Sequence, residues 1–158
     1  MRVCLPSFRR STPAALLFAG LTGCAGGALA TTVTQPSPIA APDAFRCIRE
    51  QLTVVEFAQT AYDPDRMWLK ARRFDESQRR PDTQFRRMVD RLDIEVTPGT
   101  GEALSTITAE ASTFAELTTQ RGPTEVQEKT SATAIAAAQT ILRNCSQAAG
   151  ASESPPEP

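Results

Sequence analysis

The stretch QFRRMVDRLDIEVT, residues 84–97, decides the fold of this 158-residue chain. Its residues fall into two alternating sets: Met88, Asp90, Leu92, Ile94 and Val96 on one parity, and Val89, Arg91, Asp93 and Glu95 on the other. Alternation with a period of two over this length is typical of a β-strand. The stretch therefore predicts a strand, and its neighbours can be placed from it.

Turn residues on both sides of this strand predict two hairpins. The sequence Pro98-Gly99-Thr100-Gly101 is a turn, and the Thr-rich residues 104–109 after it predict the returning strand. Earlier, Tyr62-Asp63-Pro64-Asp65 has Pro at the second position of a tight turn. We expect this turn to join strands over residues 56–61 and 67–74, with residues 78–82 as the loop between the hairpins.

A helix is predicted at each end of the folded region. Asp43 is placed to cap a helix that starts at Ala44, whose apolar positions recur every three or four residues: Ala44, Cys47, Ile48, Gln51, Leu52 and Val55. At the other end, Gly122-Pro123 with Thr124 and Gln127 resembles a capping box. The helical stripe after it consists of Val126, Thr130, Ala134, Ala137, Ile141 and Cys145.

The resulting fold class is α+β, with a four-stranded antiparallel sheet made of two hairpins and both helices on one face. The alternative is an antiparallel bundle of four helices, because Ala and Glu at 109–116 permit a helix over residues 101–121. The alternation at 88–96 favours the sheet. We expect a single small domain over 43–147, a flexible Pro/Thr/Ala tether over 24–42 and a disordered acidic tail over 148–158.

The first 23 residues have the layout of a secretory signal. Arg2, Arg9 and Arg10 precede the apolar run 13–21, which is shorter than the roughly 20 residues that span a bilayer. The run ends in Leu21-Thr22-Gly23-Cys24, and this segment resembles the lipobox of bacterial lipoproteins. The resemblance implies that residues 1–23 are cleaved off and that Cys24 is acylated on its sulfur and its new amino group.

The resemblance also predicts a location in the cell envelope, on its periplasmic or extracellular side. Ala25 stands where an Asp retains enterobacterial lipoproteins in the inner membrane, so it favours the outer membrane in an organism that has one. Two alternatives stay open. Cleavage after Ala30, behind the sequence Ala28-Leu29-Ala30, would release a soluble secreted protein. A cytoplasmic protein with a chance apolar start is the other.

The four cysteines fit an envelope protein. Cys4 leaves with the signal peptide and Cys24 takes the lipid, which leaves Cys47 and Cys145 on apolar helix faces. In an oxidising compartment such a pair predicts a disulfide, and two buried free thiols are the alternative. Two sulfurs without any histidine argue against a metal site.

Composition limits the chemistry that the chain can perform. The sequence has no histidine, so the commonest general base and the commonest metal ligand are both missing. Removal of three arginines with the signal peptide leaves a net charge of about −4, which argues against nucleic acid as a partner. The sequence contains no G-x-S-x-G, P-loop or G-x-G-x-x-G motif, and we expect no cofactor.

Residues 70–91 carry eight positive charges, and arginine suits phosphate or carboxylate partners. Trp68 is the only tryptophan and, in a strand, shares a face with Lys70 and Arg72. The predicted contacts with an anionic envelope partner are Trp68, Arg79, Arg80, Arg86 and Arg87. The competing interpretation is an ordinary solvated sheet face, because four acidic residues of the same stretch offset half of the charge.

These features favour a non-enzymatic, lipid-anchored envelope protein that works as a binding or accessory module. It would contact the membrane through the acyl chains on Cys24, and an envelope protein or an anionic glycan or lipid through its basic stretch. The alternatives are a soluble secreted domain and an envelope hydrolase that uses carboxylates. A hydrolase needs two acidic groups with pKa values pushed apart, and the sequence shows no such pair.

Overall fold

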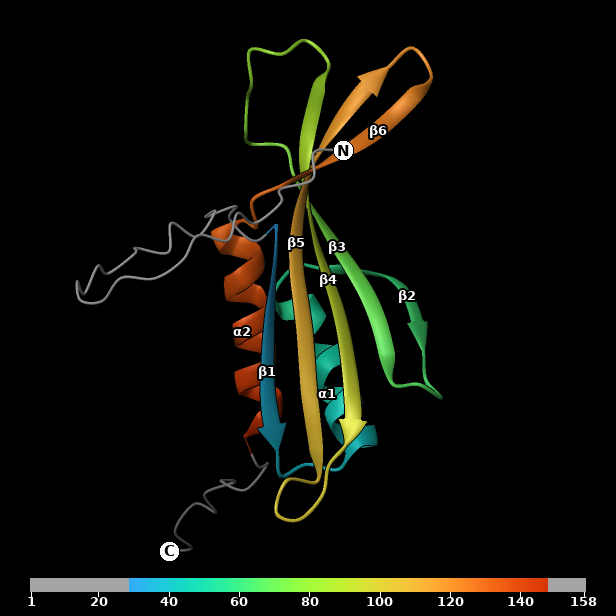
Figure 1. The fold of residues 1–158 in the computed structure, drawn as a ribbon, viewed down its shortest axis with the longest axis vertical. Coiled ribbons are helices and arrows are strands. Elements are labelled where there is room, and N and C mark those ends of the chain that lie inside the picture. Colours follow the sequence, from blue (N-terminus) through green and yellow to red (C-terminus); the bar gives the residue numbers. More distant parts are fainter. Residues whose placement is uncertain (1–28, 148–158) are drawn as a thin grey trace, which may run out of the picture.

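A computed structural model describes residues 29–147 of the chain, which form a six-stranded sheet and two helices (Figure 1). The predicted signal peptide, Cys24, Ala25 and the predicted acidic tail lie outside the described residues. None of the helices within residues 29–147 is long and apolar enough to cross a membrane. In chain order the elements are β1 (Ala30–Ser37), α1 (Ala41–Val54), β2 (Ala58–Asp63), β3 (Trp68–Asp75), β4 (Phe85–Pro98), β5 (Ser105–Thr119), β6 (Gly122–Glu128) and α2 (Ala132–Ser146).

All neighbouring strands are antiparallel, in the order β1-β5-β4-β3-β2. The remaining strand, β6, also pairs with β5. It takes up residues 113–119 of β5, whereas β1 takes up residues 105–112 of the same edge. The long strands β4 and β5 therefore extend past both helices at one end, where β6 and the loop 76–84 accompany them (Figure 1). We call this end the arm.

Both predicted hairpins are confirmed, β2 with β3 and β4 with β5. The turn of the second hairpin requires a glycine at position 99. A Cβ on Gly99 would lie 2.2 Å from the carbonyl oxygen of Ala103, closer than non-bonded atoms approach. The returning strand β5 is longer than the predicted 104–109 and reaches Thr119. This extra length carries β6 and forms the arm.

The predicted tether is wrong for its second half, because residues 30–37 form β1 and α1 already starts at Ala41. Pro36 is tolerated since β1 is an edge strand, where a missing backbone donor costs little. Val33 packs against the core, and the hydroxyl of Ser37 donates to the carbonyl of Cys145 over 3.3 Å. The folded domain therefore begins well before residue 43.

The start of the second helix also differs from the prediction. Residues 122–128 form β6, which Gly122 enters at a φ of 107° after the turn from β5. The N-cap of α2 is Ser131, whose Oγ accepts from the amide of Ala134 over 3.0 Å. In α1, Asp43 lies in the first turn and binds Arg46 instead of capping the helix, whose N-cap is Ala40.

The hydrophobic core lies between the sheet and the two helices, which pack on the same face (Figure 1). The four-helix bundle is excluded. From the sheet, the core takes the residues of one parity, and from each helix it takes the apolar stripe: Leu69, Ala71, Leu92, Ile94, Val96, Ile107, Ala109 and Ala111 with Phe45, Ile48, Leu52, Ala134, Ala138, Ile141 and Leu142. Full burial of a Leu or Ile side chain contributes about 1.5–3 kcal/mol, so this layer supplies most of the stability.

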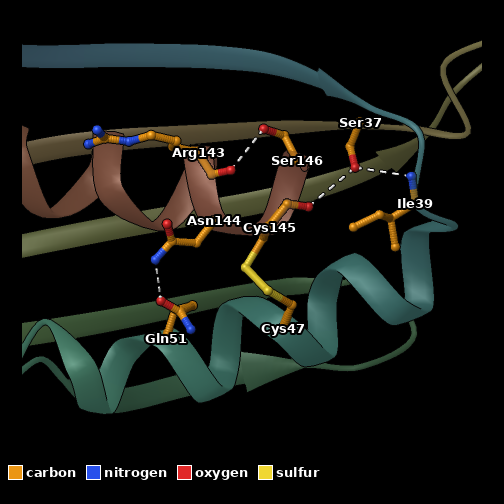
Figure 2. The surroundings of a disulfide bond; sticks show 8 residues. All are labelled: Ser37, Ile39, Cys47, Gln51, Arg143, Asn144, Cys145 and Ser146. Atoms are coloured by element: carbon orange, nitrogen blue, oxygen red, sulfur yellow. Dashed lines mark hydrogen bonds between the residues drawn. A yellow bond between two sulfur atoms is a disulfide. The ribbon is translucent and has the colours of Figure 1, made fainter. Parts of the chain in front are cut away.

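The predicted disulfide joins the two helices (Figure 2). The Cα atoms of Cys47 and Cys145 are 5.7 Å apart, and the two residues are separated by 98 positions. Nearby, the amide of Asn144 donates to the side-chain oxygen of Gln51 over 2.7 Å. The bond therefore links α1, the first helix of the core in chain order, to α2, the last element.

Candidate binding surface

The sheet face opposite the helices is covered by neither α1 nor α2 (Figure 1). We call it the open face. Because side chains alternate along a strand, the residues between the core positions lie here. They are mostly polar or charged: Thr32 and Thr34 of β1, Trp68, Lys70, Arg72 and Phe74 of β3, Arg91, Asp93 and Glu95 of β4, and Thr108, Glu110, Ser112, Phe114 and Glu116 of β5.

Two cross-strand rows of the open face place like charges opposite one another. Arg72 is in register with Arg91, and Asp93 is in register with Glu110 one row away. Directly opposed like charges destabilise a sheet pair by a fraction of a kcal/mol. The rows divide the open face into an arginine half, toward the arm, and an acidic half, toward the β4–β5 turn.

The arginine half contains Arg72, Arg86, Arg87 and Arg91. A bulge at the start of β4 sets two of them, since the register with β5 shifts between Phe85 and Arg87. A bulge re-aims side chains, and here both Arg86 and Arg87 reach Glu116. The Nη1 of Arg86 lies 2.9 Å from one oxygen of this carboxylate, and the Nε of Arg87 lies 3.0 Å from the other.

Aromatic rings support the same guanidinium groups. The Cζ of Arg87 lies 3.6 Å from the centre of the Phe74 ring, and that of Arg72 lies 4.8 Å from it. Arg91 stacks on Phe114 at 4.5 Å and forms an ion pair with Glu125. Arginine stacked on a ring keeps its fork of donors available at the edge. Among residues 29–147, Arg72 makes no ion pair, so its guanidinium is free for a ligand.

The acidic half is built around Trp68. Its indole N–H donates to a carboxylate oxygen of Asp93, and the Nζ of Lys70 lies 3.2 Å from the other oxygen. The same Nζ is 5.1 Å from the centre of the Trp68 ring. Glu95 and Glu110 are exposed beside this group. Trp68 is therefore a half-buried part of a hydrogen-bonded cluster, and the half as a whole is acidic.

Two of the depressions on this face have a residue in common. One, of about 300 Å³, spans both halves and is lined by Lys70, Arg72, Arg91, Asp93, Glu110 and Ser112 among others. The other, of about 530 Å³, adjoins the arm and is lined by Arg72, Arg86, Arg87 and Glu116 among others. Arg72 belongs to both. The arginine half is thus a continuous surface centred on this residue.

The structure places the five predicted contact residues on different surfaces of the domain. Trp68, Arg86 and Arg87 lie on the open face, in its two different halves. Arg80 instead pairs with Glu128 over 2.8 Å and contacts the sulfur of Met88, on the helix-side face of the arm. Arg79 donates to the backbone carbonyl of Glu76 within the loop.

Sequence reasoning missed Arg72 and Arg91 as members of the site. Their signal was present, because Arg72 has the strand parity of Trp68 and Arg91 has that of Asp93 and Glu95. What the sequence could not show was the register of β3 against β4, which makes the two arginines direct neighbours. The competing view of a locally neutralised face is partly supported, since Arg86, Arg87 and Arg91 have carboxylate partners.

Three further acidic residues, Asp63, Asp90 and Asp75, have structural roles. Asp63 accepts from the amides of Asp65 and Arg66 in the β2–β3 turn. The buried carboxylate of Asp90 accepts from the hydroxyls of Thr113, over 2.6 Å, and Ser131, over 2.7 Å, and so ties α2 to the sheet. In the loop of the arm, hydrogen bonds from the Ser77 hydroxyl and amide lower the pKa of Asp75. Across residues 29–147 no three His, Cys, Asp or Glu side chains are grouped as metal ligands would be.

Comparison with known proteins identifies no family for this chain. No protein-family model and no curated protein matches the sequence. Among solved structures, the crystal structure of a DUF4468 family protein from Bacteroides ovatus is similar, with 8% sequence identity and a TM-score of 0.34. The match covers 73% of this chain and 78% of that chain. A similarity at this level says nothing about function.

Proposed function

We propose that the protein is a lipid-anchored cell-envelope protein that acts as a binding or accessory module, with the open face as its contact surface. The observation that carries this proposal is the contrast across the sheet. One face is sealed by two helices, whereas within residues 29–147 no helix covers the charged surface on the other. Arg72, which lines both the 300 Å³ and the 530 Å³ depression, is the residue on which a ligand would centre.

The start of β1 supports acylation at Cys24 over cleavage after Ala30. Ala30 is the first residue of β1 and pairs with Ser112. The carbonyl of Leu29 accepts from the side-chain amide of Gln127 and the hydroxyl of Thr130, each over 3.2 Å. Cleavage after Ala30 would remove these bonds, whereas cleavage after Gly23 keeps them. By resemblance, Ala25 then directs the protein to the outer membrane in an organism that has one.

The anchor is tested by the intact mass of the mature protein purified from its own membranes. We expect a chain that starts at Cys24 and carries the mass of acyl chains. A chain that starts at Thr31 without lipid would overturn the proposal. Repeating the measurement with reductant should add two hydrogens, because the Cys47–Cys145 bond opens.

The contact surface is tested by a photo-crosslinking residue at Ser112 on the open face, with Arg143 on α2 as the matched position. Both versions are expressed in native membranes and irradiated. We expect covalent adducts from position 112 and few from position 143. Equal labelling of the two positions would contradict the assignment of the open face.

A further inference from the structure

The strand β1 brings the domain close to its anchor. Only residues 25–28 separate Cys24 from Leu29, whose carbonyl is held by Gln127 and Thr130. Five residue steps span at most about 18 Å when fully extended. A lipid on Cys24 would therefore hold this edge of the sheet within about 18 Å of the membrane surface.

The chain enters the sheet in the row of the arginine pair. Ala30 is in register with Ser112, Ser112 with Arg91, and Arg91 with Arg72. Strands in a sheet are about 4.8 Å apart, so Ala30 and Arg72 are separated by roughly 14 Å across the face. The arginine pair thus lies in the cross-strand row in which the chain enters the sheet, and Glu110 of the acidic half, in register with Thr32, is also close to that point.

The two halves of the open face respond in opposite ways to a negative surface. In the arginine half, the four guanidinium groups have three carboxylate partners, Glu116 of β5, Glu125 of β6 and Glu76 of the loop 76–84. In the acidic half, Asp93, Glu95 and Glu110 face the single cation of Lys70. An anionic membrane attracts basic groups and repels acidic ones within a Debye length.

We propose that the arginine half binds the phosphates of anionic phospholipid headgroups in the membrane that carries the anchor. The domain then lies with its open face toward the membrane, and its arginine half is closer to the headgroups than its acidic half. A guanidinium group offers paired donors that fit a phosphate, and Phe74, 37% exposed and stacked against Arg72 and Arg87, offers apolar surface that suits the membrane interface. This inference rests on the proposed function, because the anchor sets the distance.

The orientation is tested with the lipidated mature protein in vesicles. Trp68 is the only tryptophan and lies on the open face, so its energy transfer to dansyl-labelled headgroups reports how closely that face approaches the membrane. We expect greater transfer in vesicles of phosphatidylcholine with phosphatidylglycerol than in phosphatidylcholine alone. The double variant Arg72→Gln/Arg91→Gln should reduce transfer to the phosphatidylcholine level.

The matched control is Arg46→Gln/Arg143→Gln, which removes the same charge from exposed helix positions. It should transfer energy like the wild type. If transfer is the same in both kinds of vesicle and in both variants, the headgroup inference is wrong while the anchor stands. A wild-type protein without acyl mass shows instead that the proposed anchor has failed.

A second measurement does not depend on the anchor. The mature chain with Cys24→Ser is sedimented with vesicles of phosphatidylcholine and phosphatidylglycerol. Each basic residue near an anionic surface changes binding about fivefold, so Arg72→Gln/Arg91→Gln should lower the partition coefficient on the order of 10- to 30-fold. Less than a twofold change would contradict the inference, as would an equal loss for the helix-side control.

Discussion

The two faces of β4 differ strongly in burial and in charge. Leu92, Ile94 and Val96 are almost completely buried beneath the helices. Their immediate neighbours Asp93 and Glu95 lie on the open face, where cross-strand charges replace apolar contacts. The same strand thus supplies both the core and the candidate binding surface.

The comparison separates what stabilises the fold from what is available for a partner. Apolar burial on the helix face is non-directional and large, about 25 cal/mol per Å². Exposed ion pairs contribute roughly 0–1 kcal/mol each, because water screens them. Substitutions on the open face should therefore alter binding while the fold persists, whereas substitutions on the helix face should lower stability.

The largest loss of stability is expected from removing the disulfide between the two helices. Cys47→Ala/Cys145→Ala releases a loop of about a hundred residues in the unfolded chain, which should cost about 4–5 kcal/mol in the chain-entropy model. Urea unfolding of the oxidised wild type and the variant measures the difference. Wild type under reductant is the control and should approach the variant, and an unchanged midpoint would contradict the prediction.

Truncation of one buried side chain should come next. Ile94→Ala removes contacts beneath the helices and should lower the free energy of unfolding by about 2–5 kcal/mol. The matched change Glu95→Ala, one residue along on the open face, should stay within about 0.5 kcal/mol. Denaturant melts of both variants measure this, and similar losses would contradict the division between the two faces.

One carboxylate of the open face, that of Glu116, is an exception, because we expect its loss to lower stability. Glu116 is 7% exposed and accepts from both Arg86 and Arg87, so Glu116→Gln should cost about 1–3 kcal/mol by weakening charged hydrogen bonds. Glu125→Gln, which breaks a more exposed pair with Arg91, should cost less than about 1 kcal/mol. Thermal or urea unfolding compares the two. A larger loss for Glu125→Gln would show that burial does not decide the effect.

The smallest effect concerns pH at the base of the arm. Ser77 lowers the pKa of Asp75 from its ordinary value of 3.8, so the ionised carboxylate stabilises the fold above that pH. This contribution is lost as the pH falls through the lowered pKa of the folded state. The stability difference between wild type and Asp75→Ala should therefore be constant above pH 3.8 and narrow below it, as acid-range urea titrations would measure. A stability difference that grows as the pH falls would contradict this prediction.

Much of the helix face could be predicted because its signals are local. The alternation around Ile94, the turn chemistry at Pro64 and Gly99, and the apolar stripes with Cys47 and Cys145 all lie within single segments. Each of these patterns can be recognised from the residues of its own segment. The α+β class and the disulfide follow from these patterns.

The elements that were missed have ambiguous local patterns. β1 has one apolar core residue, Val33, among threonines and prolines, so nothing separates it from a linker. β6 has Thr124 and Gln127 at capping-box spacing, which fits a strand equally well. The arginine site was only partly found, because Glu116 and Glu125, the partners of its arginines, come from strands 25 or more positions away, and the bulge at Arg86 leaves no sign in the sequence.

The pairing of β1 with β5 has a consequence for how the chain reaches its fold. The first strand of the described region must wait until residues 105–112 have been synthesised, although α1 and the β2–β3 hairpin can form before then. Contacts between distant segments slow folding, because the intervening chain must first be brought into register. During that interval β1 is an unpaired strand, and Pro36 and its threonines make it a poor template for aggregation. The composition that makes β1 resemble a linker in the sequence therefore also protects the chain from aggregation until β1 pairs with β5.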